Sequence, residues 1–166
     1  MGRKRLVRTI AIVAGCSFVV GALVLTLLSL TARRPAHLGV HEGRLAACPD
    51  SPNCVCTQTD DETHRLEPLR YTGSGERAME RLKAILATQP RTRTATQTEN
   101  YLHIECTSLI FRFVDDVEFL VEDSTKTIHF RSASRAGFGD FGVNRRRMEA
   151  IRRAFDASSS EARGSG

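Results

Sequence analysis

The fold of this chain is decided by the stretch YLHIECTSLIFRFVDDVEFLVEDSTKTIHFR (residues 101–131). Apolar and polar side chains alternate over residues 101–107, over 114–122 and again from Ile128, as is typical of strands that bury one face. The side chains expected to point inward are Leu102, Ile104, Cys106, Val117, Phe119, Val121, Ile128 and Phe130. Residues 123–126 form a hairpin loop, so we expect antiparallel pairing.

The flanking segments add one strand and two helices. Threonine alternates over residues 91–98 and predicts a strand before the other three. One helix is expected from a cap at Ser74 until Pro90 ends it, and another from a cap at Asn144. Their apolar faces comprise Ala78, Met79, Leu82, Ile85 and Leu86, and then Met148, Ile151 and Phe155. The order predicts an α+β two-layer sandwich, a four-stranded antiparallel meander with both helices on one face.

The N-terminal segment differs from the rest. The stretch TIAIVAGCSFVVGALVLTLLSL, from Thr9 to Leu30, has 22 residues and no charge. As a helix it would measure ~33 Å, close to the ~30 Å hydrocarbon core of a bilayer. Four basic residues precede it, whereas only Arg33 and Arg34 follow closely. This asymmetry favours a single membrane span with a cytoplasmic N-terminus and an outward C-terminal domain.

Two processing alternatives compete with an uncleaved span. A cleaved signal peptide usually has an apolar core of roughly 7–15 residues, which this stretch exceeds. The tetrapeptide at residues 13–16, Val-Ala-Gly-Cys, is similar to the signal that precedes a lipidated cysteine, so a lipoprotein anchored at Cys16 is the alternative anchor. Strongly apolar sequence continues for 14 residues beyond Cys16, which favours the span.

The basic character of the chain belongs to this segment. The whole chain has 24 basic and 19 acidic residues, but residues 1–34 hold six of the basic ones and none of the acidic ones. The remainder is nearly neutral, so a nucleic-acid partner is not expected. We therefore divide the chain into a membrane anchor (1–34), a linker (35–47), an α+β domain (48–157) and a disordered tail (158–166).

Cysteines of the outward domain point to a disulfide. An oxidising compartment permits one, and the turn-forming residues between Cys48 and Cys54 make a small closed loop feasible. Zinc held by these two thiols, Cys56 and a histidine is the alternative, but the spacing contains no C-x-x-C pair. Cys106 falls on the apolar side of its strand. No cofactor or metal is expected.

Charge is unevenly distributed within the domain. Residues 99–123 carry seven acidic residues and one basic residue, whereas residues 131–153 carry seven arginines and two acidic residues. Glycines before the last helix permit close approach of an anion to its N-terminus. The candidate binding residues are Arg131, Arg135, Asn144, Arg145, Asp115, Asp116 and Asp140. The ligand would be a lipid head group, a phosphate or an acidic envelope polymer.

Internal pairing is the competing interpretation of the same residues. Asp115 and Asp116 would then pair with Arg131 or Arg135 across adjacent strands, and Asp140 would cap the last helix. Adjacent residues on a strand point to opposite faces, so the two aspartates are not expected to hold one metal.

An enzyme and a structural envelope protein remain alternatives. The enzyme would use Asp115, Asp116 or Asp140 as acid–base or metal residues, and its mark would be a cleft in which carboxylates converge without arginine partners. His103, Glu105 and His129 are expected on a solvated sheet face, with a metal or acid–base site formed by the three as the alternative. A structural protein would expose an apolar patch over the sheet.

Three motifs resemble a known family. They are CPDSPNCVCTQ (48–58), FVDDVEFLVED (113–123) and RSASRAGFGDFGVNRRRMEAI (131–151). In this order they resemble an uncharacterised family of bacterial and plant proteins, domain of unknown function fourteen ninety-nine (DUF1499), over residues 45–155. The family usually has serines where Cys56 and Thr57 stand here.

The resemblance implies that the three motifs form one recurring unit, and it implies no activity and no catalytic residue. Some family members are regarded as lipoproteins. Together with the apolar span, the resemblance predicts a bacterial inner-membrane protein with a periplasmic or extracytoplasmic domain.

Overall fold

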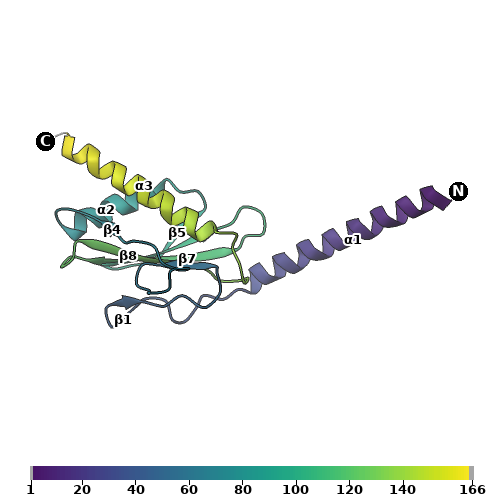
Figure 1. Ribbon diagram of the computed structural model, residues 1–166, viewed down its shortest axis with the longest axis horizontal. Coiled ribbons are helices and arrows are strands. Elements are labelled where there is room, and N and C mark those ends of the chain that lie inside the picture. The colour runs from purple at the N-terminus through teal and green to yellow at the C-terminus, as the bar shows by residue number, and fades with distance from the viewer. Residues whose placement is uncertain (1, 165–166) are drawn as a thin grey trace.

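The computed structural model describes residues 2–164, which form an α+β domain and a long N-terminal helix (Figure 1). The elements are α1 (Gly2–Thr31), β1 (Val40–His41), β2 (Arg44–Leu45), β3 (Cys54–Cys56), β4 (Leu69–Arg70), α2 (Gly75–Ala87), β5 (Thr92–Gln97), β6 (Tyr101–Thr107), β7 (Val114–Glu122), β8 (Thr127–Ser134) and α3 (Val143–Gly164).

The sheet is wider than the sequence predicts. The expected four-stranded antiparallel meander is present as β5 to β8, but β3 and β4 both pair with β8 and make the sheet six-stranded. A separate two-stranded sheet, β1 and β2, forms in the segment that we expected to be a linker. All three residues of β3 are buried, so this strand shows no alternation of polar and apolar residues that would reveal it.

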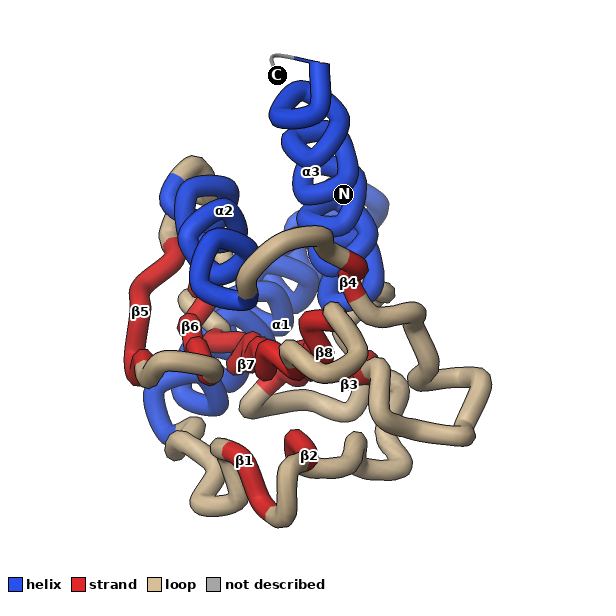
Figure 2. Tube along the Cα trace, turned by 90° about the vertical axis from the view of Figure 1, so that its left-hand side faces the viewer, coloured by secondary structure: helices blue, strands red, loops and turns tan. Residues whose placement is uncertain are grey.

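One face of the sheet carries the main hydrophobic core. Helices α2 and α3 pack on this face (Figure 2), and the inward residues expected of both helices and strands are buried there, except that Ile85 is partly exposed. Ser74 caps α2 as predicted, accepting a hydrogen bond from the backbone of Arg77. The last helix is longer than expected: α3 continues to Gly164, so residues 158–164 are helical, and residues 165–166 lie outside the described part of the chain.

The second face is covered as well. Residues 34–49, which we call the covering segment, include β1 and β2 and lie across β7 and β8 (Figure 2). Within this segment, Leu45 packs against Tyr101 and Leu120 of the sheet in a small apolar cluster. The solvated sheet face predicted from the alternation is therefore wrong for His103 and Glu105, which are buried under sequence more than fifty positions upstream, whereas His129 stays partly exposed.

The predicted disulfide between Cys48 and Cys54 is present. It joins the end of the covering segment to β3 and leaves Cys56 and Cys106 as free, buried thiols. Burial raises the pKa of the Cys56 thiol and of the Cys106 thiol. With its two leading ligands oxidised, the zinc set considered from the sequence is not formed.

Reduction of this disulfide is expected to lower the free energy of unfolding by about 2 kcal/mol, because a short loop is released in the unfolded chain. The measurement is the thermal midpoint of the full chain in detergent, with and without dithiothreitol. The double variant Cys48→Ala/Cys54→Ala is the control and should show no further response to the reductant. An equal response in that variant would assign the effect to Cys56 or Cys106.

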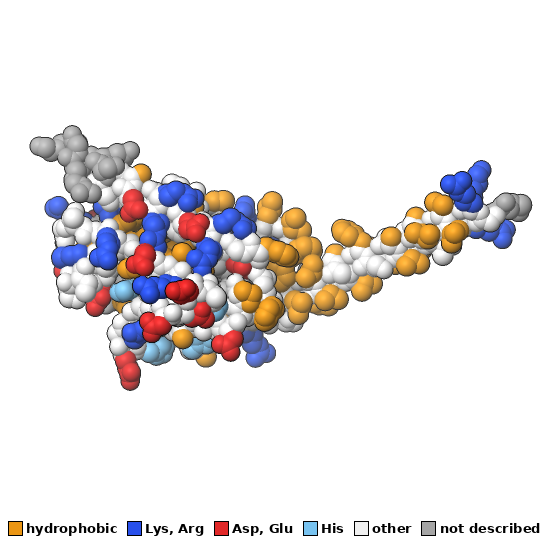
Figure 3. All heavy atoms as spheres, in the orientation of Figure 1, with side chains coloured by type: hydrophobic (Ala, Val, Ile, Leu, Met, Phe, Trp, Pro, Cys, Tyr) orange, Lys and Arg blue, Asp and Glu red, His pale blue; other side chains and the backbone are white. Residues whose placement is uncertain are grey.

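Helix α1 projects away from the domain (Figure 1), and apolar side chains line it along the face seen in Figure 3. Its most apolar stretch is not buried against the rest of the protein. Cys16 is exposed on this helix. The helix is compatible with a membrane anchor or with a signal sequence.

Candidate functional site

A layer of charged side chains lies buried between the sheet and the covering segment. Strand pairing builds it, because Glu105 stands opposite Asp116 and Glu118 stands opposite Arg131. The alternation that sends the apolar residues to the helices sends these side chains to the other face. The buried members of the layer are His103, Glu105, Asp116, Glu118 and Arg131.

Arg135, which follows β8, joins two strands of this layer. Its Nε donates to Asp116 Oδ2 at 2.7 Å, and its Nη2 donates to Glu105 Oε1 at 2.5 Å. Glu105 also accepts from Arg34 at 2.6 Å and from Arg93 at 2.5 Å. Burial opposes ionisation of Glu105, but the three arginines outweigh it and lower the pKa of the carboxyl to about 2.

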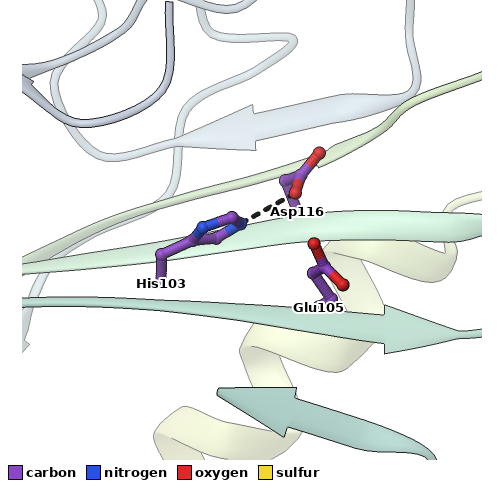
Figure 4. A group of neighbouring side chains, drawn as sticks. All are labelled: His103, Glu105 and Asp116. Carbon is purple, nitrogen blue, oxygen red and sulfur yellow. Dashed lines mark hydrogen bonds and ion pairs between the residues drawn. The ribbon is translucent and has the colours of Figure 1, made fainter. Parts of the chain in front are cut away.

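His103, Glu105 and Asp116 form a group that resembles a metal site (Figure 4). Their potential ligand atoms lie within 4.8 Å of one another, and His103 Nε2 is 2.7 Å from Asp116 Oδ1. Both carboxylates, however, already bind the guanidinium of Arg135. Burial raises the pKa of Asp116, but hydrogen bonds from Arg135 and His103 outweigh it and lower the pKa overall. The guanidinium thus supplies the positive charge that a metal ion would supply.

Glu118 is fully buried and binds three partners. Tyr101 Oη donates to Glu118 Oε1 at 2.7 Å, as does the backbone N–H of Gly39 at 2.7 Å. Burial and this bond both raise the pKa of Tyr101. Arg131 is bound more loosely, with Nη1 3.5 Å from Glu118 Oε2 and Nε 3.4 Å from the carbonyl of Ala47.

A cavity of about 520 Å³ lies against this layer. The covering segment forms one wall, and the sheet with Arg135 forms the other. Its lining includes Pro35, His37, Ala46, Ala47, Cys48, Pro49, Asp116, Arg131, Ala133, Ser134 and Arg135. Of the candidate binding residues predicted from the sequence, Arg131, Arg135 and Asp116 are therefore brought together here.

The other candidates lie on the helix-facing side of the sheet. Arg147 donates to Asp115 Oδ2 at 2.5 Å and to Asn144 Oδ1 at 2.7 Å. Asn144 also accepts from Ser132 and donates to the carbonyl of Asn53, so it ties α3 to β3 and β8. The two adjacent aspartates thus point to opposite faces, as predicted, and Asp115 pairs with an arginine that we had not assigned to it.

Asp140, rather than Asn144, caps the last helix. Its carboxylate accepts from the backbone N–H groups of Gly142 and Asn144 at 2.8 and 2.7 Å. Asn144 lies within α3, which begins at Val143. The helix N-terminus therefore binds a carboxylate of its own chain at the position proposed for a ligand. Arg145 lies apart from this group and donates to the carbonyls of Thr63 and Arg65.

The carboxylates proposed for an enzyme do not converge. Asp115 binds Arg147, Asp116 binds Arg135, and Asp140 caps α3. His129 contacts Thr57 and Glu122 rather than His103. Four residues of the charged layer were not predicted from the sequence: Glu118, Tyr101, Arg34 and Gly39. Alternation places Glu118 and Tyr101 on the charged face, whereas nothing local places Arg34 or Gly39 there.

This protein is of the class that has a small α+β domain behind an apolar N-terminal helix. In this domain a layer of charged side chains is buried under the covering segment. Within that class, the chain belongs to the DUF1499 family of proteins of unknown function, which matches residues 44–155. The matched region includes the disulfide, all six strands of the main sheet, α2 and the first part of α3, up to Phe155. No curated protein and no solved structure matches the chain.

Proposed function

We propose that this protein is a single-pass membrane protein whose outward domain binds a small anion in the cavity beneath the covering segment. Arg131 carries the proposal. Its side chain is only 3% exposed and lines the cavity, and its hydrogen bonds, at 3.5 and 3.4 Å, are the longest in the charged layer. A buried guanidinium keeps its charge and gains from closer, bidentate partners.

The lining favours a phosphate or carboxylate group. Arg131 offers planar N–H donors, Arg135 stands beside it, and the small side chains of Ala46 and Ala47 leave room in front of both. The ligand could be a free anion or the head group of a lipid. Pro35, which also lines the cavity, is four residues beyond the end of α1, so both sources are within reach.

The anchor supports an extracytoplasmic location in a bacterial inner membrane. The apolar helix is preceded by basic residues, and the disulfide fits an oxidising compartment. A lipid on Cys16 would place the domain on the same side of the membrane. The enzyme alternative has less support, because its three aspartates are bound within the fold.

The proposal is tested by thermal unfolding of the full chain in detergent with inorganic phosphate and, in a second arm, with phosphatidylglycerol added to the micelles. Ligand at 100 times its dissociation constant stabilises by about 2.7 kcal/mol, a shift of several degrees for a domain of this size. Potassium chloride at equal ionic strength controls for general salt effects. A shift in one arm identifies the source of the anion.

Arg131→Gln is expected to abolish the thermal shift, because it removes the guanidinium that would bind the anion. The fold should survive this change, since Glu118 keeps Tyr101 and Gly39 as hydrogen-bond partners. Ala47→Phe should also abolish the shift by filling the cavity without changing charge. Arg145→Gln, on another surface, is the matched control and should respond like the unmodified chain. Equal shifts in all four proteins, or none in any, would refute the binding site.

A further inference from the structure

Two loops of the domain expose large apolar side chains. Residues 108–113 join β6 to β7, and residues 135–142 join β8 to α3. At their tips, Leu109 is 71% exposed, Ile110 77%, Phe138 77% and Phe141 97%. Elsewhere in the described residues outside α1, the exposed large apolar side chains are Val40 and Val143, which are only 39% and 40% exposed. Large apolar side chains exposed together in this way mark an interaction site.

The two loops lie side by side at the end of the domain from which α1 leaves. The backbone N–H of Arg135 donates to the carbonyl of Val114 at 3.0 Å, so one loop begins where the other ends. Arg34, three residues beyond α1, binds the same Glu105 oxygen as Arg135. Figure 3 shows apolar side chains gathered at this end, next to the base of the helix.

The charges around the apolar tips are mostly positive. Residues 31–39 and 107–113 contain no acidic residue, and the single one in 135–143, Asp140, is engaged as the cap of α3. Exposed arginines lie close to the tips in the sequence, at Arg112 and Arg146, and two more, Arg33 and Arg34, follow the end of α1. Arginines beside apolar and aromatic groups suit a surface of lipid phosphates over hydrocarbon.

The backbone around Phe141 is fixed by hydrogen bonds, and both loops contain a residue in an uncommon conformation. Phe141 has φ 54° and Arg112 has φ 60°, both in the left-handed region that bulky residues rarely adopt. The carbonyl of Phe141 accepts from Arg146 Nη1 at 2.7 Å, and Asp140 binds the next N–H along the chain. The fold thus fixes Phe141 in solvent, where it contributes nothing to the core of the domain.

We propose that residues 108–113 and 135–142 dock the domain onto the surface of the bilayer that α1 crosses. The aromatic and aliphatic tips would lie at the level of the head groups, with the arginines against lipid phosphates. This inference rests on the membrane anchor of the proposed function. A bilayer is the partner that fits this apolar surface best, because only a few residues separate the end of α1 from this end of the domain.

Tryptophan fluorescence tests the docking directly, because the chain contains no tryptophan. Ile110→Trp and Phe141→Trp are made separately in the full chain and reconstituted into vesicles of phosphatidylcholine and phosphatidylglycerol. Both should show blue-shifted emission and lose intensity when brominated lipids are included. Ser124→Trp is the matched control: it lies in the turn at the far end of β7, ~30 Å away, and should stay unquenched.

Phe18→Trp, in the middle of α1, tests the membrane anchor separately from the docking of the two loops. If it is quenched while Ile110→Trp and Phe141→Trp behave like Ser124→Trp, the docking is overturned and the anchor stands. If Phe18→Trp itself is not quenched, the anchor fails and the docking fails with it. Since Ile110 and Phe141 are exposed, neither substitution removes packing from the fold.

Discussion

Arg135→Ala is expected to lower the free energy of unfolding by about 3–5 kcal/mol, the usual result of removing one member of a buried ion pair. The arginine side chain is 9% exposed and is shared by Glu105 and Asp116. Without it, Asp116 keeps only His103 as a side-chain partner in the charged layer. Urea unfolding of the full chain in detergent, followed by circular dichroism, measures the loss as a change in midpoint at constant slope.

Two further proteins make this result specific. Arg145→Ala removes an arginine that binds two backbone carbonyls at an exposed site, and it should cost about 1 kcal/mol or less. Adding Asp116→Asn to Arg135→Ala should recover part of the loss, because the uncompensated carboxylate is removed. If Arg135→Ala cost no more than Arg145→Ala, the buried network would not be holding the sheet and its covering segment together.

The helix-facing half of the fold could be predicted because it depends on local periodicity. Alternation placed Val117, Phe119 and Phe130 inward, and helical spacing placed Met148 and Phe155 against them. Strands β3 and β4 were not predicted, because they depend on pairing with a distant strand rather than on local periodicity. They have three and two residues, too few to show a period, and they exist because β8 offers an unpaired edge.

The charged layer could be predicted only in part. Polar residues on one face of a strand ordinarily indicate that this face is exposed to solvent. No sequence feature near Glu118 or His103 indicates that residues 34–49 cover them. The pairing of Asp116 with Arg135 follows from strand adjacency, and it was foreseen. Arg145 does not join the other predicted residues at the cavity, because from its position on α3 it donates to the carbonyls of Thr63 and Arg65.

Each of the two proposed sites contains a side chain that is poorly accommodated in the isolated domain. Most charges of the domain are closely bound, so they explain stability and leave little for a ligand. Arg131 is buried yet loosely bound, and Phe141 is apolar yet almost fully exposed. Burial of a loosely bound charge costs stability, and an exposed phenyl ring contributes none, so a bound anion would compensate the first and a bilayer would bury the second.

Acid is expected to unfold the domain between about pH 5 and pH 2. The pKa of Glu105 is lowered from 4.5 to about 2, so its contribution is complete above pH 4.5 and is lost as the pH falls through the folded value. A shift of this size corresponds to about 3 kcal/mol for a side chain that is only 9% exposed. Asp116, whose pKa is also lowered, acts in the same direction.

The measurement is the urea midpoint as a function of pH. Glu105→Gln should be less stable at pH 7 and should show a flatter decline below pH 5, because the group that titrates has been removed. Glu67→Gln, with a carboxylate that is 62% exposed, is the matched control and should keep the full decline. If Glu105→Gln retained that decline as well, the acid sensitivity would belong to other carboxylates, and the arginines around Glu105 would contribute less than their short bonds indicate.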